Sequence, residues 1–197
     1  MRIFTSISDP ELVTMVKNGA VGVLLTDTVY GLVCRAADKT AVTRLYELKK
    51  REGKPGTIIA AKIQQLIDLG LRGRYLKPVE SYWPNPLSVV IPCDDQTAYL
   101  HQGQHSLAVR IPAVTSLRNF LVQTGPLMTS SANAPGEPTA ANLAEAQAYF
   151  GQRVDFYVDA GQAPEPVPST VIRIVDDAVE VLRQGAVKIN ENGSIQK

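Results

Sequence analysis

Short apolar runs alternate along this chain with segments in which apolar residues recur every three or four positions. Short runs bounded by turn residues are typical of buried strands, whereas the longer spacing is typical of amphipathic helices. The runs predict strands at residues 20–25, 57–61, 87–91, 106–111, 127–128, 156–158, 170–175 and 179–182. The spaced segments predict helices starting near residues 8, 38, 115 and 142, with an interrupted helix over residues 64–82. This alternation favours an α/β domain.

Polar residues mark the ends of the predicted helices. Ser8, followed three residues later by Glu11, predicts a capping box at the start of the first helix. Asp38 is expected to cap the second helix, and Asn142 with Glu145 the last one. The helix boundaries therefore rest on capping chemistry as well as on periodicity.

An abrupt change from apolar to polar residues follows the first predicted strand. Residues 26–32 read TDTVYGL, directly after the apolar residues 20–25. Ligands of open α/β sheets commonly bind beyond such strand ends, which makes this stretch a candidate site. A plain turn in which Thr26 or Asp27 caps a following helix is the alternative.

Residues 106–111 alternate so that Leu107, Val109 and Ile111 share one face of a strand, with Ala108 and Arg110 on the opposite face. A buried arginine requires an anionic partner, because an unpaired charge is costly to bury. A structural salt bridge and a ligand carboxylate both satisfy this requirement.

Two further polar segments are candidate binding elements. Lys49, Arg51 and Lys54 supply cationic donors suited to a polyphosphate, although cations also complement the end of a helix. Residues 129–133 (TSSAN) could cradle a polar ligand or form an ordinary serine and asparagine turn. The sequence has no Walker A loop and no GxGxxG segment after a strand, so any nucleotide is bound by another device.

Composition narrows the class of protein. The chain has 197 residues, 45% hydrophobic and 20% charged, with a net charge of +1. Near-zero charge provides no general field for holding nucleic acid. Cys34 and Cys93 are too few for a zinc site or a disulfide framework, and we expect both to fill apolar space. His101 and His105 are expected at the surface. No apolar stretch is long enough to span a bilayer, so we expect a cytoplasmic protein with no membrane partner.

Six segments, in order, resemble the YrdC/TsaC/Sua5 family. They are residues 26–32 (TDTVYGL), 48–55 (LKKREGKP), 83–87 (WPNPL), 108–112 (AVRIP), 131–133 (SAN) and 168–171 (PSTV). The resemblance implies a threonylcarbamoyl-AMP synthase, which converts L-threonine, bicarbonate and ATP to threonylcarbamoyl-adenylate and pyrophosphate for the t6A modification of tRNA. It also implies a single-domain α/β fold with a twisted mixed sheet, flanking helices and a large concave cavity.

The resemblance also assigns roles to individual residues. Thr28 and Arg110 would bind threonine, the arginine at its carboxylate, with Ser131 nearby and Tyr30 in the wall. Lys49 and Arg51 would act catalytically by positioning and neutralising phosphate charge. The implied nucleotide-binding residues are Lys49, Arg51, Lys54, Ser106, Asn133 and Arg183. Mg²⁺ would be carried on the triphosphate of ATP rather than by protein ligands, and the product would pass to the downstream t6A transferase machinery.

The chain departs from the family pattern at several points. Leu25 stands where many members have proline, and Asn85 where glycine is usual. A threonine-contacting histidine found after the lysine and arginine motif of some longer members is missing here. We expect a YrdC-like domain over residues 1–187, a flexible tail over residues 188–197, and no additional Sua5-type domain. A noncatalytic module that binds tRNA or double-stranded RNA, and a YciO-like paralogue with another substrate, are the alternatives.

Overall fold

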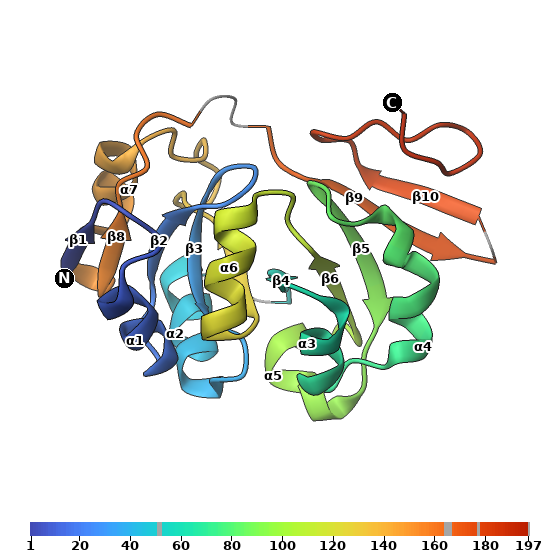
Figure 1. Cartoon of the computed structure of the whole chain (residues 1–197), viewed down its shortest axis with the longest axis horizontal. Coiled ribbons are helices and arrows are strands. Elements are labelled where there is room, and N and C mark those ends of the chain that lie inside the picture. Colours follow the sequence, from blue (N-terminus) through green and yellow to red (C-terminus); the bar gives the residue numbers. More distant parts are fainter. Residues whose placement is uncertain (51–52, 164–166, 177, 197) are drawn as a thin grey trace.

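The chain is organised around one mixed β-sheet (Figure 1). The computed structural model describes residues 1–50, 53–163, 167–176 and 178–196. Within these ranges ten strands pair in the order β1-β8-β2-β3-β7-β4-β6-β5-β9-β10, through both parallel and antiparallel ladders. The strands are β1 (Arg2–Phe4), β2 (Gly22–Leu25), β3 (Tyr30–Arg35), β4 (Thr57–Ile59), β5 (Leu87–Pro92), β6 (Ser106–Arg110), β7 (Leu127–Ser131), β8 (Phe156–Val158), β9 (Thr170–Val175) and β10 (Ala178–Arg183). The predicted mixed α/β sheet is confirmed.

Helices cover both faces of this sheet. On one face, α1 (Pro10–Lys17) contacts α6 (Thr115–Thr124). The opposite face carries the remaining helices, whose buried residues join a separate hydrophobic cluster. These are α2 (Lys39–Lys49), α3 (Ile63–Asp68), α4 (Gly73–Leu76), α5 (Ala98–His101) and α7 (Leu143–Phe150), with short 3-10 turns at η1 (Lys77–Tyr82), η2 (Asp95–Thr97) and η3 (Gly151–Arg153).

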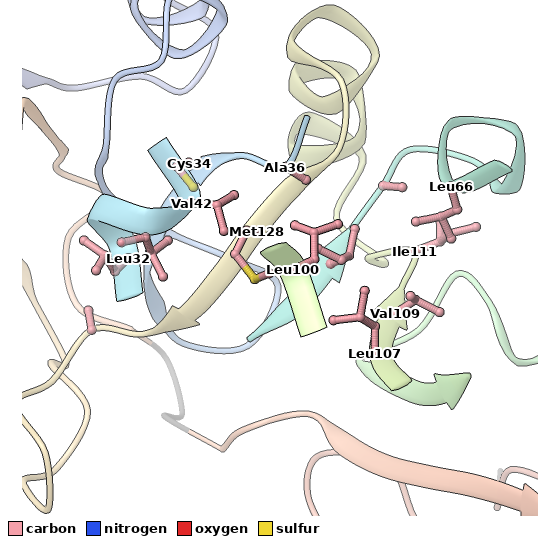
Figure 2. Packing of buried hydrophobic residues seen from close by; sticks show 14 of the residues in the cluster. Leu32, Cys34, Ala36, Val42, Leu66, Leu100, Leu107, Val109, Ile111 and Met128 are labelled. Carbon is pink, nitrogen blue, oxygen red and sulfur yellow. The ribbon is translucent and has the colours of Figure 1, made fainter. Parts of the chain in front are cut away.

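Two hydrophobic clusters arise because successive residues of a strand point to opposite faces. In β4, Ile58 packs with the helices of the α2 side, whereas Ile59 packs beneath α1 and α6. In β7, Met128 packs on the α2 side and Leu127 packs beneath α1 and α6. Figure 2 shows the larger cluster, in which side chains of β3, β6, β7 and α2 meet. Burial on both faces makes the central strands the rigid part of the molecule.

The helix caps largely follow the sequence. Asp38 accepts a hydrogen bond from the N–H of Ala41, and Asn142 accepts one from the N–H of Glu145, as predicted. At α1 the prediction was wrong, because Asp9 rather than Ser8 accepts from the Glu11 N–H. Proline at the first helical position fixes the helix one residue later than the Ser8 pattern suggests.

A strand missed by the sequence analysis changes the meaning of residues 26–32. Tyr30 begins β3, which pairs antiparallel with β2, so no helix follows the first buried strand. Residues 26–29 are therefore the turn of a hairpin. The capping alternative for Thr26 and Asp27 is wrong, because the next element is a strand.

The C-terminal segment is more structured than the expected flexible tail. Ile189 and Ile195 form a bridge, and the N–H of Asn190 donates to the carbonyl of Ser194. The Tyr82 hydroxyl donates to the carbonyl of Gly193, which ties this turn to the body of the protein. In Figure 1 the turn lies beside the β9–β10 hairpin, at the end of the molecule opposite β1. Within the described ranges, no helix has the length and apolar character needed to cross a membrane.

Candidate active site

A polar cavity, here called the front cavity, continues the sheet face that α1 and α6 cover. Ile59 of β4 pairs with Leu127 of β7 beneath those helices, and one step along the same face Thr57 pairs with Thr129. The face thus changes from apolar to polar within two residues of each strand. The cavity has a volume of about 240 Å³, and its lining comprises Thr26, Thr28, Val29, Gly31, Pro55, Gly56, Thr57, Ala108, Arg110, Thr129, Ser130, Ser131, Pro168, Ser169, Val171 and Arg183.

Arg110 is the buried cation of the front cavity. Its residue is 3% exposed, and its Nη2 lies 2.9 Å from Oδ1 of Asp27. Nη1 donates to the hydroxyl of Ser88 at 3.4 Å. Burial lowers the pKa of the Arg110 guanidinium, and the Asp27 charge acts in the opposite direction. The structural salt bridge left open by the sequence is present, and the same guanidinium also faces the cavity.

The hairpin turn places Thr28 at the cavity. The hydroxyl of Thr26 accepts from the N–H groups of Thr28 and Val29, both at 3.3 Å, and donates to the Val29 carbonyl at 2.8 Å. The hydroxyls of Thr26 and Thr28 lie 3.1 Å apart. Thr26 therefore fixes the turn, and both threonines line the cavity.

Two serine hydroxyls connect Arg110 with a second arginine. Arg183 of β10 donates from Nε and Nη2 to the carbonyl of Ser169, at 3.0 and 2.8 Å. The Ser169 hydroxyl lies 3.1 Å from that of Ser88, which in turn accepts from Arg110. The sequence analysis gave neither serine a role: Ser88 is an isolated serine within β5, and Ser169, directly before β9, was noted only as part of the motif at residues 168–171.

A second recess, the Lys49 hollow, adjoins the front cavity through a shared residue, Ser131. The Lys49 residue is 5% exposed, and its Nζ donates to the carbonyls of Ser131 and Asn133 and to Oδ1 of Asn133, each at 2.7 Å. The Ser131 hydroxyl also donates to Asn133 Oδ1, at 2.7 Å. The hollow measures about 480 Å³, and its lining comprises Lys49, Lys50, Lys54, Ser131, Asn133, Pro135 and Gly136.

Two of the residues proposed from the sequence fall elsewhere, and a third is not among the described residues. The Tyr30 side chain is buried in the core, where its hydroxyl donates to the Gly161 carbonyl, and the residue does not line the front cavity. Ser106 starts β6 opposite Pro92 and lines neither recess. Arg51 lies outside the described residues.

Close backbone packing sets the shape of the front cavity. A Cβ on Gly31 would lie 2.6 Å from the Thr129 hydroxyl oxygen, and one on Gly56 would lie 2.5 Å from the Thr129 carbonyl oxygen. Both distances are far below van der Waals contact, so any larger residue would displace strand β7 or its side chain. Glycine within or beside a strand was the available sequence signal for this close approach.

The prediction that both histidines lie at the surface is wrong for His101. His101 is 1% exposed, and its Nδ1 accepts hydrogen bonds from the N–H groups of Gly103 and His105. Nitrogen atoms of His101 and His105 and a carboxylate oxygen of Asp95 lie within 4.8 Å of one another. Because backbone N–H groups occupy Nδ1, the His101 ring anchors its loop.

Comparison with known proteins gives the same family as the sequence motifs. A family model for Sua5, YciO and YrdC proteins, described as telomere recombination, matches residues 14–185. A threonylcarbamoyl-AMP synthase of Chromohalobacter salexigens is 33% identical over 167 residues, which cover 82% of this chain and 89% of that protein. A threonylcarbamoyl-AMP synthase of Bacillus subtilis is 29% identical, over 92% of this chain and 55% of the longer relative.

Solved structures extend the comparison to the fold. P. abyssi Sua5 complexed with L-threonine superposes with a TM-score of 0.83 at 26% identity, covering 95% of this chain and 58% of that one. E. coli YciO, with a TM-score of 0.78 at 22% identity, covers 94% and 96% of the two chains and shows the shared fold. The chain thus spans little more than half the length of Sua5. With the family model matched over most of its length, the chain belongs to the Sua5/YciO/YrdC family.

Proposed function

We propose that this protein is a threonylcarbamoyl-AMP synthase, which forms threonylcarbamoyl-adenylate and pyrophosphate from L-threonine, bicarbonate and ATP. The observation that carries the proposal is a buried arginine, Arg110, in a small polar cavity that adjoins a lysine-lined hollow through Ser131. The relatives named as threonylcarbamoyl-AMP synthases and the Sua5 complex with L-threonine support it.

The front cavity suits an amino acid. Arg110 would bind the threonine carboxylate through charge-assisted hydrogen bonds. Thr28 and Ser131 would offer hydroxyls to the rest of the molecule, and Arg183 lies within the same lining. A volume of about 240 Å³ accommodates a small zwitterion better than a nucleotide.

The larger Lys49 hollow suits the nucleotide. Lys49 and Lys54 supply positive charge, and Asn133 is held in place by Lys49 and by its own amide, which donates to the Glu137 carbonyl at 2.7 Å. Arg51 would add a guanidinium from the adjoining segment. The described residues that line the two recesses include no carboxylate, so Mg²⁺ would arrive bound to the triphosphate rather than to a protein cage.

The reaction needs no protein nucleophile. The threonine amine combines with bicarbonate with loss of water, or with dissolved CO₂ with loss of a proton, and in either case an N–C bond forms to give a carbamate. A carbamate oxygen then attacks the α-phosphate of ATP, and pyrophosphate leaves. Holding the two anionic reactants together and neutralising their charge would provide most of the catalysis. The adenylate would then pass to the t6A transferase machinery in the cytoplasm, and any contact with tRNA would be weak.

The test is pyrophosphate release by the purified protein with ATP, as a function of added threonine and bicarbonate. The proposal predicts release that requires both, and a product containing the intact threonine carbon skeleton and AMP. Serine and L-threoninamide serve as matched controls, lacking the methyl group and the carboxylate, respectively. Pyrophosphate release that does not depend on threonine would refute the proposal, and activity with a different co-substrate would favour a YciO-like paralogue.

A further inference from the structure

Asp27 does not line the front cavity. It lines a neighbouring recess of about 300 Å³, here called the back cavity, which shares Thr26 and Thr28 with the front cavity and also includes Val114 and Leu117. The Asp27 side chain is 1% exposed, and that of its partner Arg110 is 4% exposed. Arg110 lines the front cavity and Asp27 lines the back cavity, so their ion pair forms part of the partition between the two.

The surroundings leave Arg110 dependent on Asp27 for charge compensation. Apart from the ion pair, its Nη1 donates to the neutral Ser88 hydroxyl at 3.4 Å, and neither its Nε nor Asp27 Oδ1 has a hydrogen-bond partner among the described residues. Asp159 is the other acidic residue of the back cavity, and it accepts from the Gly161 N–H rather than from Arg110. Removal of one member of a buried ion pair is strongly destabilising, because the other charge is left uncompensated.

Asp27 contributes little to the geometry of the turn itself. The Thr26 hydroxyl makes the hydrogen bonds that close the turn, to Thr28 and Val29. Beyond the ion pair, Asp27 Oδ2 accepts from the N–H of Ala113 at 3.4 Å, which is a long contact. A role confined to holding the turn therefore does not account for a buried carboxylate at this position.

We propose that Asp27 is a positioning and specificity-determining residue, which holds the Arg110 guanidinium at the cavity wall and compensates its charge so that small anions are not captured by charge alone. The identity of the physiological ligand, the threonine carboxylate, rests on the function proposed above. The carboxylate of threonine, bicarbonate and the phosphates of ATP are all anionic. An uncompensated Arg110 would therefore attract each of them to the same position in the front cavity. With Asp27 in place, an anion must also make the hydroxyl and shape contacts of the front cavity.

The test uses acetate as a carboxylate that lacks every other feature of threonine. For Asp27→Asn, acetate at constant ionic strength is expected to inhibit in competition with threonine, with an inhibition constant roughly tenfold below that of the wild type. The KM for ATP is expected to stay the same with and without acetate. Asp159→Asn is the matched control, since it removes a carboxylate of the same cavity that does not contact Arg110, and it should behave as the wild type.

Thermal unfolding provides a readout that needs no enzymatic activity. Asp27→Asn is expected to lower Tm by roughly 10 °C, and acetate should restore part of that loss in this variant alone. The double variant Asp27→Asn/Arg110→Gln removes both charges and should recover most of the Tm with no response to acetate.

Each outcome bears on the proposal. Equal acetate inhibition in wild type and Asp27→Asn, an equal response in Asp159→Asn, or a double variant as unstable as Asp27→Asn would overturn it. The acetate-dependent Tm of Asp27→Asn tests the ion pair even if wild-type protein releases no threonine-dependent pyrophosphate, so failure of this inference is distinguishable from failure of the proposed function.

Discussion

The front cavity and the Lys49 hollow are held in place by different parts of the fold. Strand register positions Arg110 and Thr129, because β4, β6 and β7 are buried on both faces and pair continuously. The hollow is built from the end of α2 and from the loop after β7, where Lys49 reaches across to Asn133. A sheet-built site is rigid before substrate arrives, whereas a loop-built site depends on a few side-chain hydrogen bonds. We therefore expect threonine recognition and nucleotide recognition to fail separately.

The largest expected effect comes from Arg110→Gln. Loss of the guanidinium should raise the KM for threonine by roughly a hundredfold, because a charge-assisted carboxylate contact disappears. It also leaves Asp27 buried without its partner, which should cost about 3–5 kcal/mol of stability. Initial rates of pyrophosphate release against threonine, together with urea unfolding, measure both effects. An ATP defect as large as the threonine defect would contradict the division between the two recesses.

Lys49→Met should weaken ATP use by roughly ten- to a hundredfold, since charged hydrogen bonds worth about 1.5–3 kcal/mol hold Asn133 and the carbonyl of Ser131. Arg51→Ala is expected to have an effect of the same size. Lys50→Met is the matched control, because Lys50 lines the same hollow but is exposed. Rates measured against ATP at saturating threonine decide this, and unchanged rates in both Lys49→Met and Arg51→Ala would refute the phosphate assignment.

Gly31→Ala sharpens the argument that the front cavity is rigid. Its Cβ would lie 2.6 Å from the Thr129 hydroxyl oxygen, so we expect a loss of about 1–3 kcal/mol in the free energy of unfolding. The variant Gly31→Ala/Thr129→Ala removes the clashing oxygen and should recover part of this loss. If Gly31→Ala unfolds at the wild-type urea concentration, the strand yields easily and the cavity is less rigid than proposed.

Asp155 offers a smaller, pH-dependent effect away from both recesses. Burial raises the pKa of Asp155. Hydrogen bonds from Arg44 and from the Val21 N–H lower the pKa by more than burial raises it, so the net pKa is below its ordinary value. A pKa lowered by folding stabilises the protein above the unfolded value and loses that contribution as pH falls through the folded value. Asp155→Asn should thus reduce stability at pH 7 and matter less near pH 3, without changing the KM for threonine. A difference in urea unfolding that is independent of pH would contradict this account.

Periodicity and capping predicted most of the elements, because strands buried on both faces and capped helices have local signatures. Strand β3 was missed because it begins directly after a polar turn and has glycine, Gly31, as its second residue, which suggests a loop rather than a strand. Strand β1 is short and, except for Phe4, exposed, so no apolar run marks it. Strand β1 pairs with the distant β8, and β3 pairs with the distant β7 as well as with β2, and a local pattern does not contain the long-range pairings.

The position of a site residue could be predicted where alternation along a strand showed which face of the sheet it lies on. Alternation in β6 placed Arg110 opposite the apolar face that contains Val109, and that arrangement is found. The same reasoning could not identify Asp27 as the partner of Arg110, because the two are 83 residues apart in sequence and meet only when β2 and β6 join one sheet. Tyr30 was included in the predicted site because it lies within the motif at residues 26–32, but its side chain is buried in the core.

Calorimetric titration of L-threonine in the presence of ATP, into wild type, Arg110→Gln and Lys49→Met, tests the central claim most directly. The claim is that the front cavity binds threonine and the Lys49 hollow binds the nucleotide. It predicts that Arg110→Gln loses the threonine heat at concentrations that saturate the wild type, while ATP titrated alone still binds. Lys49→Met should show the reverse, with ATP binding weakened. Threonine binding that survives in Arg110→Gln, with ATP binding lost instead, would contradict the account.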